Sequence, residues 1–464
     1  MRLPKAHQVV LGLGVAMFVF VIGSGVVPAI TGWHDHSTVQ REVFVNVPTA
    51  MKVAFYGAVA TMLLIVAWLA SLRVRNYERG LADDRRTTRK NVEKRVKSYR
   101  SGVWMQTLLR DPAAGLMHAL LYFGFVSLFV VTVLSETDHH LPDRFKVLHG
   151  QTYEAYSAGA EIAGLMFLVG IVWAISRRYV QRPYRIRIKT RPEDALILGT
   201  FLVIGLTGFF VEAARIAAEG KPYFEKWSFV GYGLANLIDT WPLHTLTLVH
   251  RWLWGIHVVA FLVFLAILPT TKLRHMFTSP MNMYLRDRDR PKGAMKPMPN
   301  LMETELESFG AVKIEDFTWK QLMDTDACTV CGRCTSVCPA HATGKPLDPR
   351  EIVLKVGEVM AATGDPVVSP PVGIDPEISI GADSVFERVS PEEIWACTSC
   401  KACDEICPVH IEILDKILDM RRYKSLMESD FPAELGRTYQ AMENQQNVYG
   451  MNQGERGDWA STLD

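Results

Sequence analysis

The pattern of apolar and polar positions divides the chain into a hydrophobic first part and a polar second part. Six stretches of the first part are apolar over about 20 positions, enough for a helix to cross the hydrocarbon layer of a bilayer. They cover residues 8–30, 49–72, 116–134, 157–176, 194–218 and 241–277. We therefore predict six transmembrane helices. The first is expected to stay uncleaved because its apolar run is longer than that of a signal peptide.

The loops between these stretches alternate in positive charge, and this predicts their orientation. Segments 73–110 and 177–191 hold twelve and seven Lys and Arg residues, whereas segments 31–48, 135–156 and 219–243 hold one, two and two. Positively charged loops stay in the cytoplasm. The protein is thus expected to span the inner membrane with both termini and its polar second part in the cytoplasm.

The polar second part follows a charged, proline-containing linker. Apolar periodicity predicts helices over residues 301–317, 351–362 and 411–427. Residues 364–383 are rich in Pro and Gly and are expected to form a loop. The formal net charge of the 464 residues is +1, so nothing indicates a nucleic-acid partner.

All eight cysteines fall in two runs with the same spacing, C-x2-C-x2-C-x3-C-P. In two-cluster ferredoxins the fourth cysteine of such a run ligates the other cluster. We expect one [4Fe–4S] cluster on Cys328, Cys331, Cys334 and Cys407, and a second on Cys397, Cys400, Cys403 and Cys338. The alternative is zinc, which favours paired cysteines, so two complete four-cysteine runs argue against it.

Histidines in the apolar stretches form a second candidate site, because ionisable side chains are costly inside a membrane. His118 begins the third stretch, and His275 lies at the inner end of the sixth. These helices are predicted to run in opposite directions, so both histidines are expected near the cytoplasmic surface. We expect them to ligate an inner haem b.

An outer haem is expected on His257, with a partner from His139 or His140. His257 lies 18 residues before His275, about 27 Å along a continuous helix. His139 lies 21 residues beyond His118, which predicts a similar depth.

Three further residues compete for roles near the outer haem. His250 and His149 are rival ligands, and Arg251 is a candidate partner for a haem propionate. For each histidine the alternative is a hydrogen bond to a backbone carbonyl, and for Arg251 it is extension to the membrane surface.

Residues 100–285 resemble the membrane cytochrome b of the respiratory nitrate reductase gamma subunit and of the heterodisulfide reductase membrane subunit. The stretch HVVAFLVFLAILPTTKLRHMF is similar to that family's final helix, in which two ligands have the spacing of His257 and His275. The nitrate reductase type has a second ligand ten residues after the first on an earlier helix, where this chain has Leu128.

Two other features extend the resemblance. The first helix and the stretch REVFVNVPTAMKVAFYG resemble membrane iron–sulfur oxidoreductases related to heterodisulfide reductase. The long insert between the cysteine runs resembles the α-helical ferredoxin module of succinate dehydrogenase and heterodisulfide reductase subunits.

The resemblance implies an all-α protein, with a six-helix transmembrane bundle of the cytochrome b type followed by an α-helical ferredoxin domain. The expected parts are two transmembrane helices (1–72), a basic cytoplasmic loop (73–110), a haem b membrane domain (111–285), a linker (286–300), the ferredoxin domain (301–430) and a tail that contacts a partner subunit (431–464).

The implied function is that of an electron-transfer subunit of a quinone oxidoreductase complex. Electrons would pass between a cytoplasmic redox partner, two [4Fe–4S] clusters, one or two haems b, and menaquinone or another quinone. Related oxidoreductases continue into cysteine-rich CCG domains, so the expected partner is a separate CCG-domain, heterodisulfide-reductase-like subunit or an electron-transfer flavoprotein. The alternatives are a haem-free membrane-anchored ferredoxin and a membrane scaffold with a regulatory metal domain.

Overall fold

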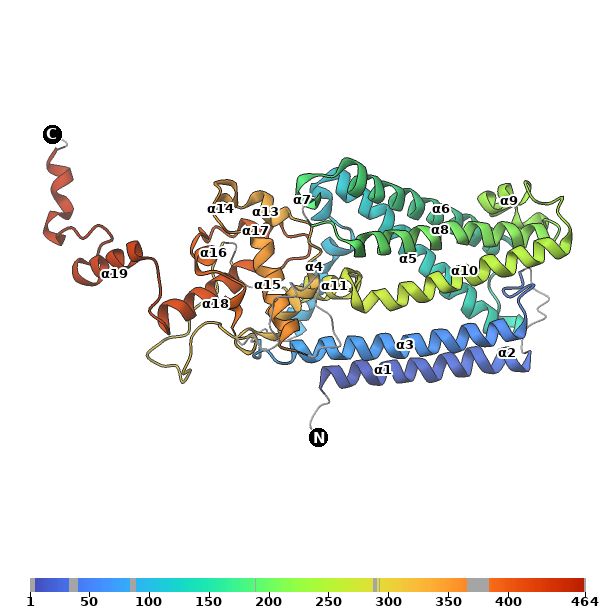
Figure 1. The fold of residues 1–464 in the computed structure, drawn as a ribbon, viewed down its shortest axis with the longest axis horizontal. Coiled ribbons are helices and arrows are strands. Elements are labelled where there is room, and N and C mark those ends of the chain that lie inside the picture. The colour runs from blue at the N-terminus through green and yellow to red at the C-terminus, as the bar shows by residue number, and fades with distance from the viewer. Residues whose placement is uncertain are drawn as a thin grey trace.

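The computed structural model describes residues 5–32, 41–83, 89–187, 189–286, 290–291, 293–364 and 384–462. Over these residues the secondary structure is helical, with no β-strand and one isolated parallel bridge between Leu81 and Thr318. A long bundle of helices is followed, beyond one of its ends, by a smaller helical domain (Figure 1). The predicted all-α architecture is confirmed.

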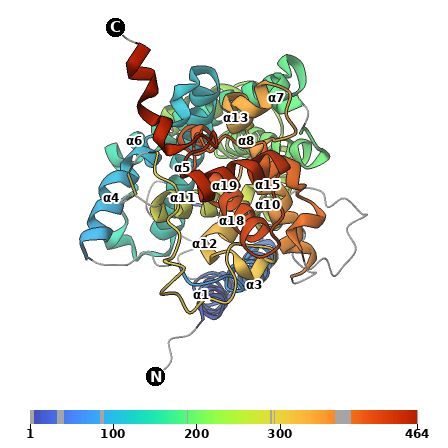
Figure 2. The same cartoon turned by 90° about the vertical axis from the view of Figure 1, so that its left-hand side faces the viewer.

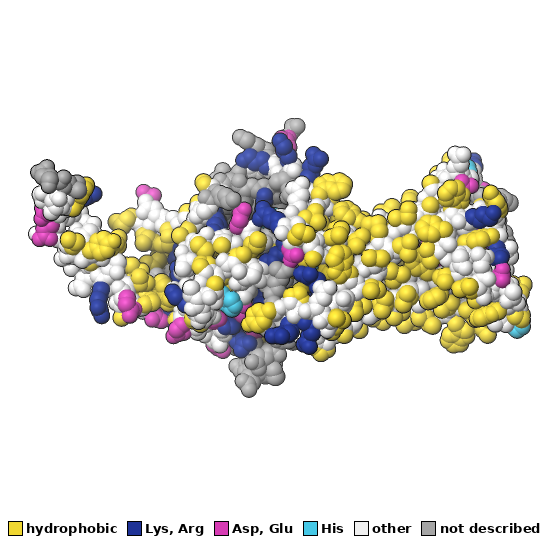
Figure 3. All heavy atoms as spheres, turned by 90° about the horizontal axis from the view of Figure 1, so that it is seen from above, with side chains coloured by type: hydrophobic (Ala, Val, Ile, Leu, Met, Phe, Trp, Pro, Cys, Tyr) yellow, Lys and Arg dark blue, Asp and Glu magenta, His cyan; other side chains and the backbone are white. Residues whose placement is uncertain are grey.

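Six helices of the described chain are long and apolar enough to cross a membrane, as predicted. They are α1 (Ala6–Val21), which continues through a π-helical turn into α2 (Val27–Thr31), α3 (Thr49–Tyr77), α5 (Pro112–His140), α6 (Gly150–Ile175) with a π-helical end, α8 (Pro192–Ala218) and α10 (Leu243–Thr270). Apolar side chains cover the shaft of the bundle, and Lys and Arg side chains gather where the bundle meets the second domain (Figure 3). This distribution is typical of a bundle whose sides contact lipid.

The bundle is held together by helix pairs and a central group of aromatic rings. Helix α1 packs on α3, α5 on α6, and α8 on α10. Phenylalanines from α5, α6, α8 and α10 meet with ring centroids 5.6 to 6.3 Å apart: Phe125, Phe167, Phe201 and Phe264. Such tilted aromatic contacts add to the stability that the buried ring area provides.

The sixth apolar stretch is not one helix, which corrects the prediction. Helix α10 contains Pro269 in its last turn and ends at Thr270. Thr271 is extended, a 3₁₀ turn follows, and a new helix, α11 (His275–Leu285), begins at His275. A proline cannot donate to the helical hydrogen-bond ladder, and the extended Thr271 then redirects the chain. His257 and His275 therefore lie on two different helices.

Helix α5 is longer than its apolar run. Asp111 caps it by accepting a hydrogen bond from the Ala114 N–H at 3.3 Å, and Pro112 occupies the first turn, where a missing N–H costs nothing. The helix continues to His140 before the chain turns at Pro142. His118 thus lies two turns from the start of α5, and His139 lies at its end.

Short helices connect the membrane spans: α4 (Arg89–Val103), α7 (Tyr184–Arg187) and α9 (Phe229–Ala235). The second domain consists of α12 (Trp319–Ala327), α13 (Arg333–Val337), α14 (Pro339–Ala342), α15 (Pro349–Ala362), α16 (Pro391–Trp395), α17 (Ala402–Ile406), α18 (Ile413–Leu426) and α19 (Ala433–Gln445). Seen from its own end, this domain places α12, α15 and α18 across the end of the bundle (Figure 2).

The second domain has its own core, and four of the cysteines belong to it. The core side chains come mainly from α15 and α18 and include Ile352, Val356 and Ile417, all fully buried. Asp324 of α12 joins the core to α18 through a buried ion pair, with the Lys416 ammonium 2.6 Å away. The cysteine sulfurs are thereby held in a rigid apolar frame.

Two of the three helices predicted in this domain are present, as α15 and α18. Residues 301–317 are not helical apart from a 3₁₀ turn at Ile314–Asp316, so that prediction is wrong. Gly310 has φ +88°, a backbone conformation that excludes a right-handed helix at this position. It also passes so close to the Asp419 carbonyl of α18 that a Cβ would not fit. The predicted loop at 365–383 lies outside the described residues.

Candidate redox sites

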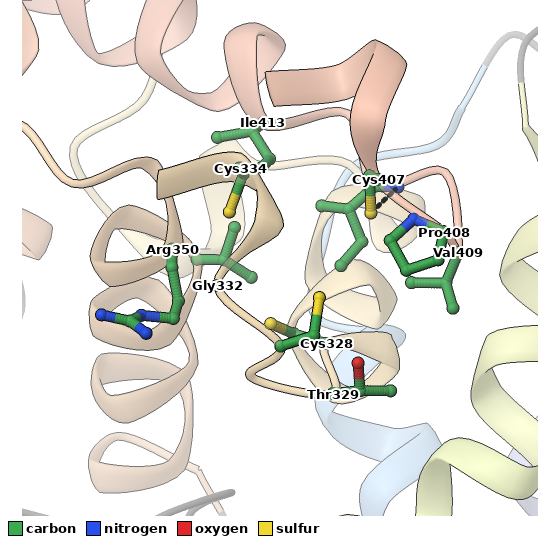
Figure 4. A pocket seen from close by; sticks show the side chains of 12 residues that line it. Cys328, Thr329, Gly332, Cys334, Arg350, Cys407, Pro408, Val409 and Ile413 are labelled. Carbon is green, nitrogen blue, oxygen red and sulfur yellow. Dashed lines mark hydrogen bonds between the residues drawn. The ribbon is translucent and has the colours of Figure 1, made fainter. Parts of the chain in front are cut away.

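Four cysteines line one cavity inside the second domain. Cys328 and Cys331 come from the loop after α12, Cys334 from α13, and Cys407 from the end of α17. The labelled sulfurs of Cys328, Cys334 and Cys407 point toward one another across the cavity (Figure 4). The structure thus brings together the three cysteines that open the first run and the last cysteine of the second run.

The two cysteine runs share one backbone conformation. Residues two and four positions after the first cysteine have positive φ in both runs: Val330 and Gly332 in the first, Ser399 and Lys401 in the second. This left-handed backbone is unfavourable for non-glycine residues. It turns backbone N–H groups toward sulfur, as the Ser399 N–H does to Cys397 Sγ at 3.4 Å. The Ile411 N–H donates to Cys407 Sγ at 3.3 Å, and such bonds tune the potential of a bound cluster.

The remaining four cysteines do not line this cavity. Cys338 ends α13 and is close enough to Cys397 for their charges to interact. Cys403 is buried on α17, and Cys400 is the one exposed cysteine of the eight. An open groove lies beside Cys400, lined by side chains of both charges.

Burial disfavours the ionised form of three cysteines of the first cavity. Burial raises the pKa of the Cys328 thiol to about 12, and the nearby Cys331 adds to the effect. Burial and the neighbouring sulfurs also hold the pKa values of Cys334 and Cys407 well above the ordinary range. Four thiolates are therefore stable here only when a metal compensates their charge, as iron does.

A single zinc ion is the alternative to a cluster at this cavity. Zinc sites favour paired cysteines, whereas the eight cysteines of this chain form two complete four-cysteine runs. The spacing of these runs favours an iron–sulfur cluster.

His118 and His275 face each other at the end of the bundle next to this cavity. Their ring centroids are 6.5 Å apart. Two imidazoles that bind one metal from opposite sides have centroids roughly 6 Å apart, because each metal–nitrogen bond is about 2 Å long. His275 Nδ1 lies 2.6 Å from the Lys272 carbonyl, to which its N–H donates, so Nε2 remains to bind iron. His118 and His275 would hold the iron of a haem.

His257 has a hydroxyl partner, because its Nδ1 lies 2.9 Å from Thr207 Oγ1. The helix break at Thr271 means that His257 and His275 do not share one continuous helix. The expected pairing of His257 with His139 or His140 stays a prediction.

The remaining candidates have other neighbours. His139 packs edge-on against Phe44 with centroids 5.2 Å apart, and His140 lies 3.0 Å from the Glu136 carboxylate. His250 is buried, and its Nδ1 has no hydrogen-bond partner among the described residues. Arg251 Nε donates to the Asn46 carbonyl at 2.7 Å, and His149 precedes α6 on the surface.

Comparisons with known families divide the chain at the same place as the structure. Residues 97–290 match the nitrate reductase gamma subunit family, and residues 327–412 match the 4Fe-4S dicluster domain family. The chain joins a nitrate reductase gamma-like membrane domain to a 4Fe–4S dicluster domain. The gamma-like domain contains His118, His257 and His275, and the dicluster domain contains all eight cysteines.

Three curated proteins are similar to this chain. The EtfAB:quinone oxidoreductase of Syntrophomonas wolfei is 32% identical over 378 residues, which are 76% of this chain and 52% of that protein. The probable iron-sulfur-binding oxidoreductase FadF of Bacillus subtilis is 28% identical over 434 residues, 86% of this chain and 60% of that protein. A probable membrane-anchored ferredoxin of Chromohalobacter salexigens is 41% identical over 164 residues, 33% of this chain and 24% of that protein.

The aligned part of this chain thus spans 52% and 60% of the lengths of the first two of these relatives. No solved structure matches this chain significantly. The matches make the protein a membrane-associated relative of iron–sulfur oxidoreductases.

The sequence did not single out four residues that the structure places between the two sites: Arg73, Tyr77, Arg274 and Asp326. Their partners are far apart in sequence, up to 253 positions for Arg73 and Asp326. The available signal was their position: Arg274 precedes His275, and Asp326 lies two residues before Cys328.

Proposed function

We propose that this protein transfers electrons between a cytoplasmic redox partner and membrane quinone through two [4Fe–4S] clusters and one haem b. The observation that carries the proposal is the position of the paired histidines beside the cavity of the first four cysteines. Each site alone could be structural. Placed side by side at the membrane surface, they form a path from the soluble domain into the bilayer.

The ligands follow from the residues that the structure brings together. The first cluster is assigned to Cys328, Cys331, Cys334 and Cys407, and the second to Cys338, Cys397, Cys400 and Cys403. His118 and His275 hold the haem, which supplies one-electron chemistry when bound. The Lys272 carbonyl orients His275. The apolar core excludes water around the sulfurs, and the Ile411 N–H stabilises negative charge on Cys407.

The chain next to each of the two histidines contacts the segments around the first cavity. Arg333, next to Cys334, donates to the Thr107 and Leu108 carbonyls at 3.0 and 2.8 Å, just before α5. Its charge is close enough to act on His118. On the other side, Asn282 of α11 donates to the Val409 carbonyl at 2.9 Å, two residues after Cys407. The haem and the first cluster would therefore be close neighbours.

The second cluster faces away from the membrane and is the proposed point of exchange with the partner. Cys400 is exposed, and the groove beside it includes Lys401 and Glu405. Helix α19 projects beyond this domain (Figure 1) and has no buried residue. Its exposed Tyr439 and Met442 provide apolar contacts for a partner protein, as proposed for residues 431–464.

The partner class is taken from the relatives. The relative that matches 76% of this chain is named for EtfAB and quinone, so an electron-transfer flavoprotein is the first candidate. The dicluster domain is also 31% identical over 101 residues to one component of a CoB-CoM heterodisulfide reductase of Methanosarcina acetivorans, 22% of this chain and 46% of that component. A heterodisulfide-reductase-like protein is therefore the second candidate. The arginine- and lysine-rich loops at the ferredoxin end support a cytoplasmic position for that end.

A haem-free membrane-anchored ferredoxin is the alternative. The Chromohalobacter salexigens relative, which is named a probable membrane-anchored ferredoxin, favours it. Iron analysis and a visible spectrum of the purified protein decide between them. We expect about eight cluster iron atoms per chain plus one haem iron, and a sharp band of reduced haem b above the broad cluster absorption. Full cluster iron without the sharp band would establish the alternative, and zinc in place of iron would exclude both.

A further inference from the structure

A buried group of charged side chains lies between the histidine pair and the first cysteine cavity. Asp326, at the end of α12, is 1% exposed. Its carboxylate lies 2.7 Å from Arg274 Nε and 3.3 Å from Arg73 Nη1, and it accepts a hydrogen bond from the Tyr77 hydroxyl. We call these four residues the junction cluster. It joins α3 and the turn before α11 to the soluble domain.

The junction cluster is fixed on both sides by bonds to the backbone. Arg73 Nε donates to the Pro269 carbonyl at 2.8 Å, at the helix break before His275. Arg274 Nη1 donates to the Thr271 carbonyl at 2.9 Å. The guanidinium groups therefore hold the turn that presents His275 while they also bind Asp326.

Helix α11 makes a second set of contacts to the same segment. Thr278 Oγ1 donates to the Asp326 carbonyl at 2.9 Å, and Ser279 Oγ donates to the Ala327 carbonyl at 3.1 Å. These carbonyls immediately precede Cys328. The chain that carries one haem ligand is thus bonded directly to the chain that carries one cluster ligand.

The junction cluster brings opposite charges together in the protein interior. It contains two guanidinium groups and one carboxylate, and all three residues are almost completely buried. Arg274 lies 2.7 Å from the carboxylate of Asp326, two residues before Cys328, so its positive charge lies near the first cysteine run. A buried positive charge near a cluster stabilises its more negative, reduced form.

We propose that Arg274 raises the reduction potential of the first cluster, and that Asp326 is the positioning residue that balances this charge and fixes the cluster against the histidine pair. The inference rests on the proposed cluster and haem ligation. It adds a specific charged residue that sets the energy of electron transfer between the first cluster and the haem. Arg274 serves both sites because it is bonded to the turn before His275 and its charge lies near the first cysteine run.

The test uses the full chain with its cofactors, purified in detergent, and measures the first cluster's midpoint potential by paramagnetic resonance. Arg274→Gln should lower the equilibrium constant for reduction about tenfold, which is about 59 mV for a one-electron couple. Asp326→Asn should shift the potential in the opposite direction, because it removes the negative charge that lies against both guanidinium groups. Structural damage alone would not give shifts of opposite sign.

Two further variants serve as controls. Arg274→Lys keeps the charge and should keep a potential near that of the wild type. Arg79→Gln removes an arginine that is not part of the junction cluster. Arg79 also contacts the second domain, where it binds Glu315 at 2.8 Å and the Met360 carbonyl, away from the cysteines. It should leave the potential unchanged. If Arg274→Gln loses haem, the cluster titration can still be read, because it needs no haem.

The outcomes separate this inference from the proposed function. A wild-type protein without clusters or haem overturns both. If the wild type contains all its cofactors, the inference alone is overturned when Arg274→Gln and Asp326→Asn leave the potential of the first cluster unchanged. It is also overturned when Arg79→Gln shifts that potential as much as Arg274→Gln does.

Discussion

At the scale of single residues, side chains from distant segments meet at each candidate site: Cys407 lines one cavity with Cys328, and His118 lies beside His275. Cysteine spacing alone predicted that Cys407 would join Cys328, and the structure places both at one cavity. Histidine identity predicted the His118–His275 pair, which the structure brings to 6.5 Å between ring centroids. The junction cluster could not be predicted, because an ordinary Asp326 becomes distinctive only when Arg73, 253 positions earlier, lies beside it.

The crossed cluster ligation can be tested with two matched serine variants. Cys407→Ser should damage the first cluster, since the Cys407 sulfur lines its cavity, although the other cysteines of its own run serve the second. Cys338→Ser should damage the second cluster instead. Paramagnetic resonance of the two reduced variants measures each cluster separately. Loss of the second cluster in Cys407→Ser, with the first intact, would contradict the assignment.

Histidine variants test the haem site. His275→Ala should remove the haem and leave both clusters, because the histidine pair faces the bundle and the cysteine frame does not depend on it. His257→Ala is the control: it removes a histidine bonded to Thr207 and should keep the full haem content. Pyridine haemochrome analysis and cluster spectra measure both cofactors. Haem retention in His275→Ala would show that the ligand pair is misassigned.

At the scale of elements, long apolar runs predicted helices reliably, but not where each one ends. Helix α5 extends six residues beyond the predicted 134 because nothing breaks it before Pro142. Helix α10 ends early because Pro269 and the extended Thr271 interrupt it. Residues 301–317 have helix-like periodicity, yet they follow an extended path because Gly310 packs against the end of α18. Tertiary contacts decided these cases, and a single sequence does not reveal them.

The connection after α3 is a second element whose packing is specific. The Leu81 N–H donates to the Phe317 carbonyl at 2.8 Å, and a Cβ on Gly80 would lie 2.6 Å from that same oxygen. Gly80→Ala should therefore force the two parts apart, at a cost of about 1–3 kcal/mol. Thermal bleaching of the clusters at a fixed heating rate should occur at lower temperature. Gly57→Ala, where no atom lies within 4 Å of the added Cβ, is the control and should not lower that temperature.

At the scale of the whole molecule, the two domains form one ordered series of sites. Cys400 is exposed at the far end of the soluble domain, the first cavity lies inside it, and the His118–His275 pair begins the membrane bundle. Contacts from α3, α11 and the segment before α5 hold this order. The order was predictable from the sequence of motifs along the chain. The short distance between the sites was not predictable, because it depends on how the linker packs against the second domain. One contact of the linker is the ion pair between Arg290 and Asp415, at 2.7 Å.

A linear series predicts how each cofactor responds when the first cluster is lost. A soluble low-potential donor should reduce the exposed second cluster of Cys407→Ser at a rate near that of the wild type, because Cys400 and its groove are unchanged. Haem reduction by the same donor should be lost in this variant, although the haem is still bound. In Cys338→Ser, both the transfer of electrons from the donor to the second cluster and the reduction of the haem should be impaired. Stopped-flow absorbance follows the cluster and haem bands in one experiment. If haem in Cys407→Ser is reduced as fast as in the wild type, electrons reach the haem without passing through the first cluster, and the series is incorrect.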